Sequence, residues 1–301
     1  MPTSLVLAIF GTTVPDALPG LIAIRNHCRV VFLHTETHFA CTSDTIRAVW
    51  RQRAADPDYR RLHPDVPAEI FSLRGVLATI GHLQDMGHRQ IVIQPACIAP
   101  AEEYHDLLSC ARGLASMRAA QPQRAPFEAL ALGRPLLGGG QGQRSYTDDI
   151  LTVARALAGD AELARREKAM LLYAGHGSSL FPVGGLYLEF AARMRQLYPD
   201  VATEVACLEG FPTLTDVMAK LSASGIASET RRIIIRPLLV AAGMHTRQHL
   251  AGDEPSSWRN RLVQAGWQVM PVLTGLGEVT AIAEIFTQHA ADAARDAGLS
   301  L

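Results

Sequence analysis

The sequence of 301 residues lacks the features that mark membrane and nucleic-acid-binding proteins. No uninterrupted apolar run approaches the roughly 18 residues that a membrane-spanning helix needs, which argues against membrane insertion. Its 28 basic and 29 acidic side chains nearly balance, and no run of Lys or Arg is present, so little would attract nucleic acid. We therefore expect a globular protein with neither a membrane nor a nucleic acid as partner.

Cysteine and nucleotide-binding motifs are also scarce. The five cysteines are scattered and form no CxxC pair, which favours reduced thiols and a cytoplasmic location over disulfides or a closed zinc site. The apolar run at residues 5–9 has no basic segment before it and is expected to be a strand, not a signal peptide. The glycine-rich segment 138–143 matches neither a phosphate loop nor a dinucleotide fingerprint, so no nucleotide cofactor is expected.

Short runs rich in Val, Ile and Leu alternate with longer segments whose apolar residues recur every three to four positions. The pattern predicts strands over residues 5–9, 30–33, 90–93, 128–132, 169–173, 203–208, 232–235 and 267–272. It predicts helices over residues 68–86, 102–117, 148–158, 187–197, 214–222, 256–265 and 277–294. Such alternation is typical of βαβ units with parallel sheets that are buried on both faces.

The length predicts two domains, and the glycine-rich segment near the middle is their expected boundary. This gives an N-terminal lobe over residues 1–140 and a C-terminal lobe over residues 141–301. The predicted fold class is α/β, with two similar lobes, each a mostly parallel four-stranded sheet flanked by helices. The active site is expected in the cleft between the lobes.

An internal repeat supports two similar lobes. Residues 8–13 align with residues 174–179 at an offset of 166, and residues 90–95 align with 232–237 at an offset of 142. The first half therefore carries 24 more residues between these points, which fits the polar stretch at 56–67.

Polar side chains follow several of the predicted strands, and ligands of open parallel sheets bind beyond the carboxyl ends of strands. His176, Glu209 and His245 follow three strands of the second half, and Glu103 stands at the position equivalent to His245 in the first half. Imidazole and carboxylate suit borderline divalent ions such as Co²⁺, Fe²⁺, Ni²⁺ or Zn²⁺. The pattern alone leaves open the alternative that His176 and His245 are two unrelated turn histidines.

These residues lie within a longer series of motifs, at residues 10–12, 94–95, 102–104, 175–177, 208–212, 237–245, 251–254, 257–258 and 275–278. In this order and spacing, the chain resembles along nearly its whole length the CbiK-type cobalt chelatases, which insert cobalt into sirohydrochlorin in anaerobic cobalamin synthesis. The resemblance implies that His176 and His245 bind the metal and that Glu103 is the active-site glutamate. Met244 and Thr246 flank the second histidine where family members often have Asp and Ala.

The resemblance implies ATP-independent insertion of Co²⁺ into sirohydrochlorin, with His176 and His245 holding the metal while Glu103 accepts a pyrrole proton or helps to hold the ion. The residues expected to contact the macrocycle are Phe10, Gly11, Thr12, Gly177, Glu209 and Arg247. Arg236 is a second candidate for binding its carboxylates. Iron insertion for sirohaem, a carrier that binds tetrapyrrole or metal without turnover, and a metal-dependent hydrolase are the alternatives, and homo-oligomerisation is left open.

Overall fold

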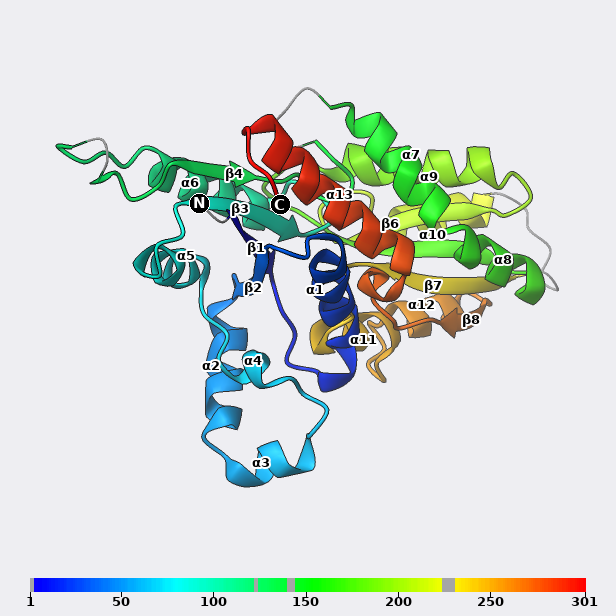
Figure 1. Cartoon of the computed structure of the whole chain (residues 1–301). Helices are drawn as coiled ribbons and strands as arrows, with labels where there is room; N and C mark the ends of the chain where they lie inside the picture. The colour runs from blue at the N-terminus through cyan, green and yellow to red at the C-terminus, as the bar shows by residue number, and fades with distance from the viewer. Residues whose placement is uncertain (1–2, 122–123, 140–143, 224–230) are drawn as a thin grey trace.

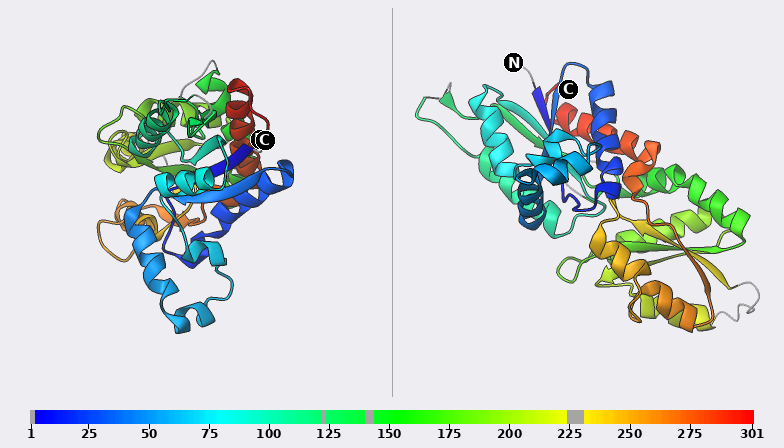
Figure 2. Two further views of the ribbon diagram at one scale, coloured as in Figure 1. Left: turned by 60° about the vertical axis from the view of Figure 1, so that its left-hand side comes forward. Right: turned by 90° about the horizontal axis from the view of Figure 1, so that it is seen from below.

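The computed structural model describes residues 3–121, 124–139, 144–223 and 231–301, except the side chain of His245. Two parallel four-stranded sheets flanked by helices lie at opposite ends of the molecule, which confirms the predicted fold class (Figures 1 and 2). The first sheet has the order β2-β1-β3-β4, with β1 (Thr3–Ile9), β2 (Glu36–Cys41), β3 (Gln90–Ala96) and β4 (Ala129–Leu132). The second has the order β6-β5-β7-β8, with β5 (Met170–Gly177), β6 (Thr203–Glu209), β7 (Arg232–Leu238) and β8 (Gln268–Pro271).

The helices between the strands cover both sheets. In the first half they are α1 (Pro19–Val31), α2 (Asp44–Ala54), α3 (Pro57–Leu62), α4 (Ala68–Phe71), α5 (Val76–Asp85) and α6 (Glu102–Ala115). In the second half they are α7 (Tyr146–Ala156), α8 (Ala158–Glu167), α9 (Gly184–Leu197), α10 (Leu214–Ala223), α11 (Met244–Ala251), α12 (Trp258–Gln264) and α13 (Thr280–Asp296). Within the described residues, short 3₁₀ turns are formed by η1 (Pro15–Ala17) and η4 (Leu276–Glu278).

The predicted strand at residues 30–33 is wrong, because helix α1 continues through Val31 and the strand is β2. Val30 is 71% exposed and Leu33 is 77% exposed, so most of this apolar run lies on the surface at the end of a helix, and Phe32 is its buried member. Strand β2 begins with polar residues, and its apolar half, Phe39 to Cys41, is buried together with Thr37. Side-chain hydropathy therefore pointed to the wrong segment.

The helix predicted over residues 68–86 is interrupted. Helices α4 and α5 are separated by an extended stretch in which the carbonyl of Arg74 accepts a hydrogen bond from the amide of Cys41, at the end of β2. The break between the two helices thus supplies a hydrogen-bond acceptor for the backbone amide of the last residue of β2.

The two sheets share one register, in agreement with the internal repeat. Ala8 pairs with Pro95 between β1 and β3, and the equivalent Ala174 pairs with Pro237 between β5 and β7. Strands β2 and β6 keep the offset of 166, so the 24 surplus residues lie between β2 and β3. This longer connection contains α2, α3 and α4, which extend away from the first sheet in Figure 1.

The C-terminal helix α13 packs on the first lobe although it follows the second sheet in the chain. It contacts α1, β3 and β4, and Figure 1 shows it (red) across the junction of the two lobes. Ala290 and Ala294 of α13 share a buried cluster with Leu5, Cys28 and Val92. A division at residue 140 thus separates the strands of the two sheets but not the helices that cover them.

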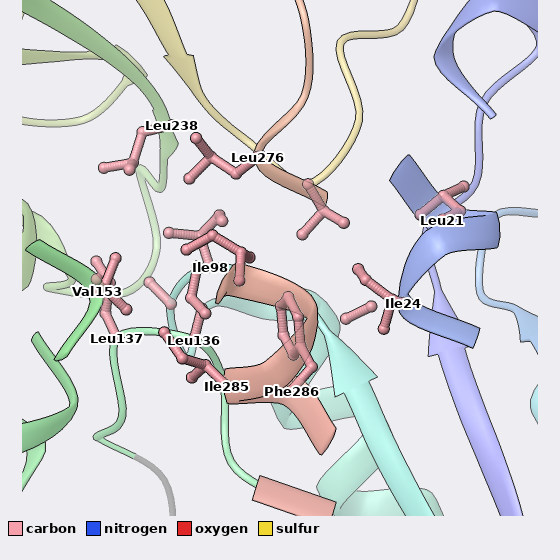
Figure 3. Close-up of a cluster of buried hydrophobic side chains, with 14 of the residues drawn as sticks. Leu21, Ile24, Ile98, Leu136, Leu137, Val153, Leu238, Leu276, Ile285 and Phe286 are labelled. Atoms are coloured by element: carbon pink, nitrogen blue, oxygen red, sulfur yellow. The ribbon is translucent and has the colours of Figure 1, made fainter. Parts of the chain in front are cut away.

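One buried apolar cluster joins the lobes (Figure 3). It brings together Ile98, Leu136 and Leu137 of the first lobe, Val153, Leu238 and Leu276 of the second, and Ile285 and Phe286 of α13. Because this core is continuous, it limits the movement of one sheet relative to the other.

A buried ionic cluster reinforces the same junction. Arg134, after β4, donates through Nε and Nη2 to the two carboxylate oxygens of Asp149 in α7, at 2.7 and 2.9 Å. Its Nη1 donates to Oδ2 of Asp292 in α13 at 2.9 Å, and Nε2 of His289 lies 3.2 Å from Oδ1 of Asp149. Burial alone would raise the pKa of Asp149, but hydrogen bonds from His289 and Arg134 bring it below its ordinary value.

Replacing Asp149 with asparagine should lower the free energy of unfolding by about 3 kcal/mol, since it leaves the buried Arg134 and His289 with one charged partner fewer. The matched control is Asp200→Asn, which removes the partner of Arg165 in an exposed pair and should change stability little. Urea unfolding at pH 7 measures both. Equal effects of the two substitutions would contradict a structural role for the buried cluster.

Candidate active site

His176 lies at the end of β5 between two glycines that the packing requires. A Cβ atom on Gly175 would lie 2.5 Å from Cε1 of Tyr187, and one on Gly177 would lie 1.9 Å from the carbonyl oxygen of Glu209. Gly177 also has a φ of +74°, which disfavours other residues. The glycines therefore let β5 end in close contact with β6 and α9, with the imidazole of His176 exposed between them.

The hydrogen bonding of His176 suits a metal ligand. Its Nδ1 lies 3.2 Å from the carbonyl oxygen of Gly177, and because a carbonyl only accepts, Nδ1 is the donor. In the neutral ring, Nε2 then carries a lone pair. A backbone carbonyl that fixes the tautomer in this way is typical of metal-binding histidines.

Glu103 approaches the same place from the first lobe. It lies in the first turn of α6, and the hydroxyl of Thr42, after β2, donates to its Oε1 at 2.7 Å. Burial raises the pKa of Glu103 to about 7, while Thr42 and the nearby His176 act in the opposite direction. A carboxyl group with this pKa exchanges a proton near neutral pH.

The backbone of His245 lies in the first turn of α11, a helix that begins directly after Gly243. A Cβ on Gly243 would lie 3.3 Å from Oγ1 of Thr12, so this helix begins against the strand-end loop of the first lobe. The side chain of His245 is outside the described part of the structure, and its role as a metal ligand stays a prediction. Among the described side chains, no three His, Cys, Asp or Glu residues form a group that could hold a metal ion.

Three of the residues expected to contact a macrocycle follow β1. Phe10 is 57% exposed, and Gly11 has a φ of +91°. Thr12 is buried: its hydroxyl accepts a hydrogen bond from the amide of Val14, and its carbonyl accepts one from Nε1 of Trp50. Thr12 thus shapes the loop, whereas Phe10 presents an apolar surface.

The remaining expected contacts come from the second lobe. Glu209 is exposed at the end of β6, where its backbone pairs with Gly177. Arg247 is partly buried and donates through Nε to the carbonyl of Ala242. Substrate contact by these residues, like that by Phe10, stays a prediction.

Arg236 was expected to be a second arginine that binds substrate carboxylates, but its side chain is not available for this. The side chain is buried, and it donates to Oδ2 of Asp160 at 3.2 Å and to the carbonyl of Thr274 at 2.7 Å. Its position within β7 places it in the interior of the second lobe, where it joins neighbouring elements.

Sequence reasoning missed two contacts between the lobes. The hydroxyl of Ser178 donates to Oε1 of Glu102 at 2.6 Å, and the ring of His105 stacks on that of Phe181, with centroids 4.3 Å apart. The proximity of Ser178 to His176 and of Glu102 to Glu103 was the available signal. Neither pair could be inferred without knowing that α6 faces the loop after β5.

The two-lobed fold is similar to that of the chelatase SirB. SirB from Bacillus subtilis with Fe³⁺ matches with a TM-score of 0.63 at 16% identity, over 99% of this chain and 98% of that one. The sirohydrochlorin chelatase SirB from Bacillus subtilis subspecies spizizenii in complex with cobalt matches with a TM-score of 0.58 at 13% identity, over 98% and 97% of the two chains. At these identities, the likeness establishes the fold.

Residues 3–295 match the family described as Cobalt chelatase (CbiK), and the chain belongs to that family. The sirohydrochlorin cobaltochelatase of Salmonella typhimurium is 26% identical over 290 residues, which are 96% of this chain and 95% of that protein. The sirohydrochlorin cobaltochelatase CbiKC of Nitratidesulfovibrio vulgaris is 28% identical over 202 residues, 67% of this chain but only 64% of that protein, so the match spans less than two thirds of its length. The resemblance seen in the motifs is thereby confirmed. Within the described residues, no helix is long and apolar enough to cross a membrane.

Proposed function

We propose that this protein inserts Co²⁺ into sirohydrochlorin without ATP. The observation that carries the proposal is that Glu103, a carboxyl whose pKa burial raises to about 7, lies close enough to His176 of the opposite lobe for the imidazole to act on that pKa. Membership of the cobalt chelatase family and the names of the two relatives support the choice of metal and tetrapyrrole.

Metal insertion requires a divalent ion to shed water and a tetrapyrrole to lose its pyrrole protons. His176 and His245, both from the second lobe, hold Co²⁺ as neutral imidazoles in this proposal. Glu103, from the first lobe, accepts a pyrrole proton, and Thr42 orients the carboxylate that does so. The substrate macrocycle binds between them, with Phe10 and the glycine-bearing loops against it.

Iron insertion is the second candidate. The SirB structures that share this fold are described with Fe³⁺ and with cobalt, and imidazole ligands bind both metals. A carrier that binds without turnover is the non-enzymatic alternative.

A metallation assay separates these functions. A small fraction of an equivalent of protein is mixed with sirohydrochlorin and Co²⁺, Fe²⁺ or Ni²⁺, with and without ATP, and absorbance reports the metallated product. We expect many equivalents of cobalt product per protein, with no effect of ATP. Product that stops at one equivalent would indicate a carrier, and faster conversion with Fe²⁺ would assign the protein to iron.

The rate of insertion should fall as pH is lowered through about 7. Glu103 accepts a proton only when it is ionised, and its pKa is about 7. Below that pH, kcat/KM, which reports the free enzyme, should therefore fall by about tenfold per pH unit. Initial rates from pH 5.5 to 8.5, with the tetrapyrrole well below its KM, measure this. A rate that is flat from pH 6 to 8 would contradict the role of Glu103 as proton acceptor.

A further inference from the structure

Ser178 and Glu102 form a hydrogen bond that connects the two sides of the candidate site. Ser178 is buried, and while it donates to Glu102 at 2.6 Å, its Oγ accepts from the amides of Leu180 at 3.0 Å and Phe181 at 2.8 Å. The hydroxyl thus uses its one proton and both lone pairs. It fixes the fold of the loop after β5 and fastens that loop to the start of α6.

A second contact joins the same two elements. His105 lies three residues after Glu102, on the same side of α6, and its ring stacks on Phe181 with an interplanar angle of 9°. Helix α6 is thus attached to the loop over its first turn, at two points on one face. These four residues, Glu102, Ser178, His105 and Phe181, join α6 to the loop after β5 and are called the clasp.

The clasp adjoins both reacting groups in the chain. His176 precedes Ser178 by two residues, and Gly177 between them is confined by the carbonyl of Glu209. Glu103 follows Glu102, and because successive helical residues point in different directions, Glu102 can bind the loop while Glu103 turns toward Thr42. Any shift between α6 and the loop would therefore change the separation of Glu103 and His176.

The equivalent place on the other side of the site is built differently. Thr12 is the counterpart of Ser178, and its hydroxyl likewise accepts from the amide two residues on, that of Val14. The counterpart of Glu102 is Met244, which carries no carboxylate. Both halves therefore share the turn in which a hydroxyl accepts a backbone amide hydrogen bond. Among the described residues, only the second half's hydroxyl, that of Ser178, also donates to a glutamate of the opposite lobe.

We propose that the clasp positions Glu103 opposite His176, and that Glu102 and Ser178 are positioning residues for proton transfer rather than catalytic ones. The inference rests on the proposed function. It assigns to the neighbouring glutamate a task distinct from that of Glu103.

The test compares variants that break the hydrogen bond with variants that keep it. Glu102→Ala and Ser178→Ala should lower kcat by about tenfold to a hundredfold, because displacement of a proton acceptor by about 1 Å has effects of this size, and KM for sirohydrochlorin should be unchanged. Glu102→Gln and Ser178→Thr keep an acceptor and a donor and should retain most of the rate. The double variant Glu102→Ala/Ser178→Ala should be no slower than either single variant. The control Ser222→Ala removes an exposed hydroxyl of α10 and should change nothing.

Multiplicative losses in the double variant, or failure of Glu102→Gln to recover the rate, would overturn the proposal. A readout independent of turnover is amide hydrogen exchange: Glu102→Ala should speed exchange at the Phe181 amide by about tenfold or more, since the Ser178 acceptor is then no longer held. Unchanged exchange would overturn the clasp. A wild-type protein that inserts no metal would overturn the proposed function, and the exchange measurement would then still decide on the clasp.

Discussion

Glu103→Gln should lower kcat for metal insertion by about 10²- to 10⁴-fold, the usual contribution of a positioned proton acceptor. The amide has nearly the shape of the carboxyl and still accepts the hydrogen bond from Thr42, so the fold should be kept. The pH dependence through about 7 should disappear from the residual rate. The matched control is Glu284→Gln, which lies on the exposed face of α13. A Glu103→Gln enzyme with wild-type kcat would contradict the assignment.

The same substitution should stabilise the protein at alkaline pH. Burial raises the pKa of Glu103 from its ordinary 4.5 to about 7, so the stability that its protonation provides is complete below about 4.5 and lost as pH rises through about 7. At pH 8, the glutamine variant should exceed wild type by roughly 1–2 kcal/mol, less than the full shift implies because the side chain is only partly buried. At pH 4, the two should unfold at the same urea concentration. A variant less stable than wild type at pH 8 would contradict this account.

His176→Ala should lower the rate of insertion by about 10³-fold or more and weaken Co²⁺ binding at least as much, since loss of even a residue that supports a metal ligand costs 10- to 100-fold. The side chain is exposed, so the free energy of unfolding should change by less than about 0.5 kcal/mol. His34→Ala, in an exposed turn after α1, is the control and should keep full activity. Steady-state rates and titration with Co²⁺ measure the two effects. Wild-type rates in His176→Ala would remove this residue from the mechanism.

The carboxyl ends of the strands could be located from the sequence because buried parallel strands have a simple pattern. The apolar runs before His176 and Glu103 became β5 and β3, and chain order together with parallel pairing brings such ends to one edge of each sheet. The repeat added that the two lobes have equivalent registers. Predicting that His176 lies near Glu103 required only these facts and the assumption that the two lobes face each other.

What the sequence could not supply depends on packing between distant segments. Three of the six residues of β2 are apolar, against all four of residues 30–33, and it is the position of β2 beside β1 that buries Phe39. The sequence of α13 is that of an amphipathic helix, which would be the same against either lobe. It therefore did not predict that α13 packs on the first lobe. Glu102 and Ser178 lie far apart in the chain and carry no spacing that predicts their hydrogen bond.

The most direct test of the account is a crystal of this protein soaked with Co²⁺ and measured at the cobalt absorption edge. We predict an anomalous peak about 2 Å from a ring nitrogen of both His176 and His245, with the carboxyl of Glu103 facing it from the first lobe. A peak bound by other residues, or one that touches only one of the two imidazoles, would contradict it.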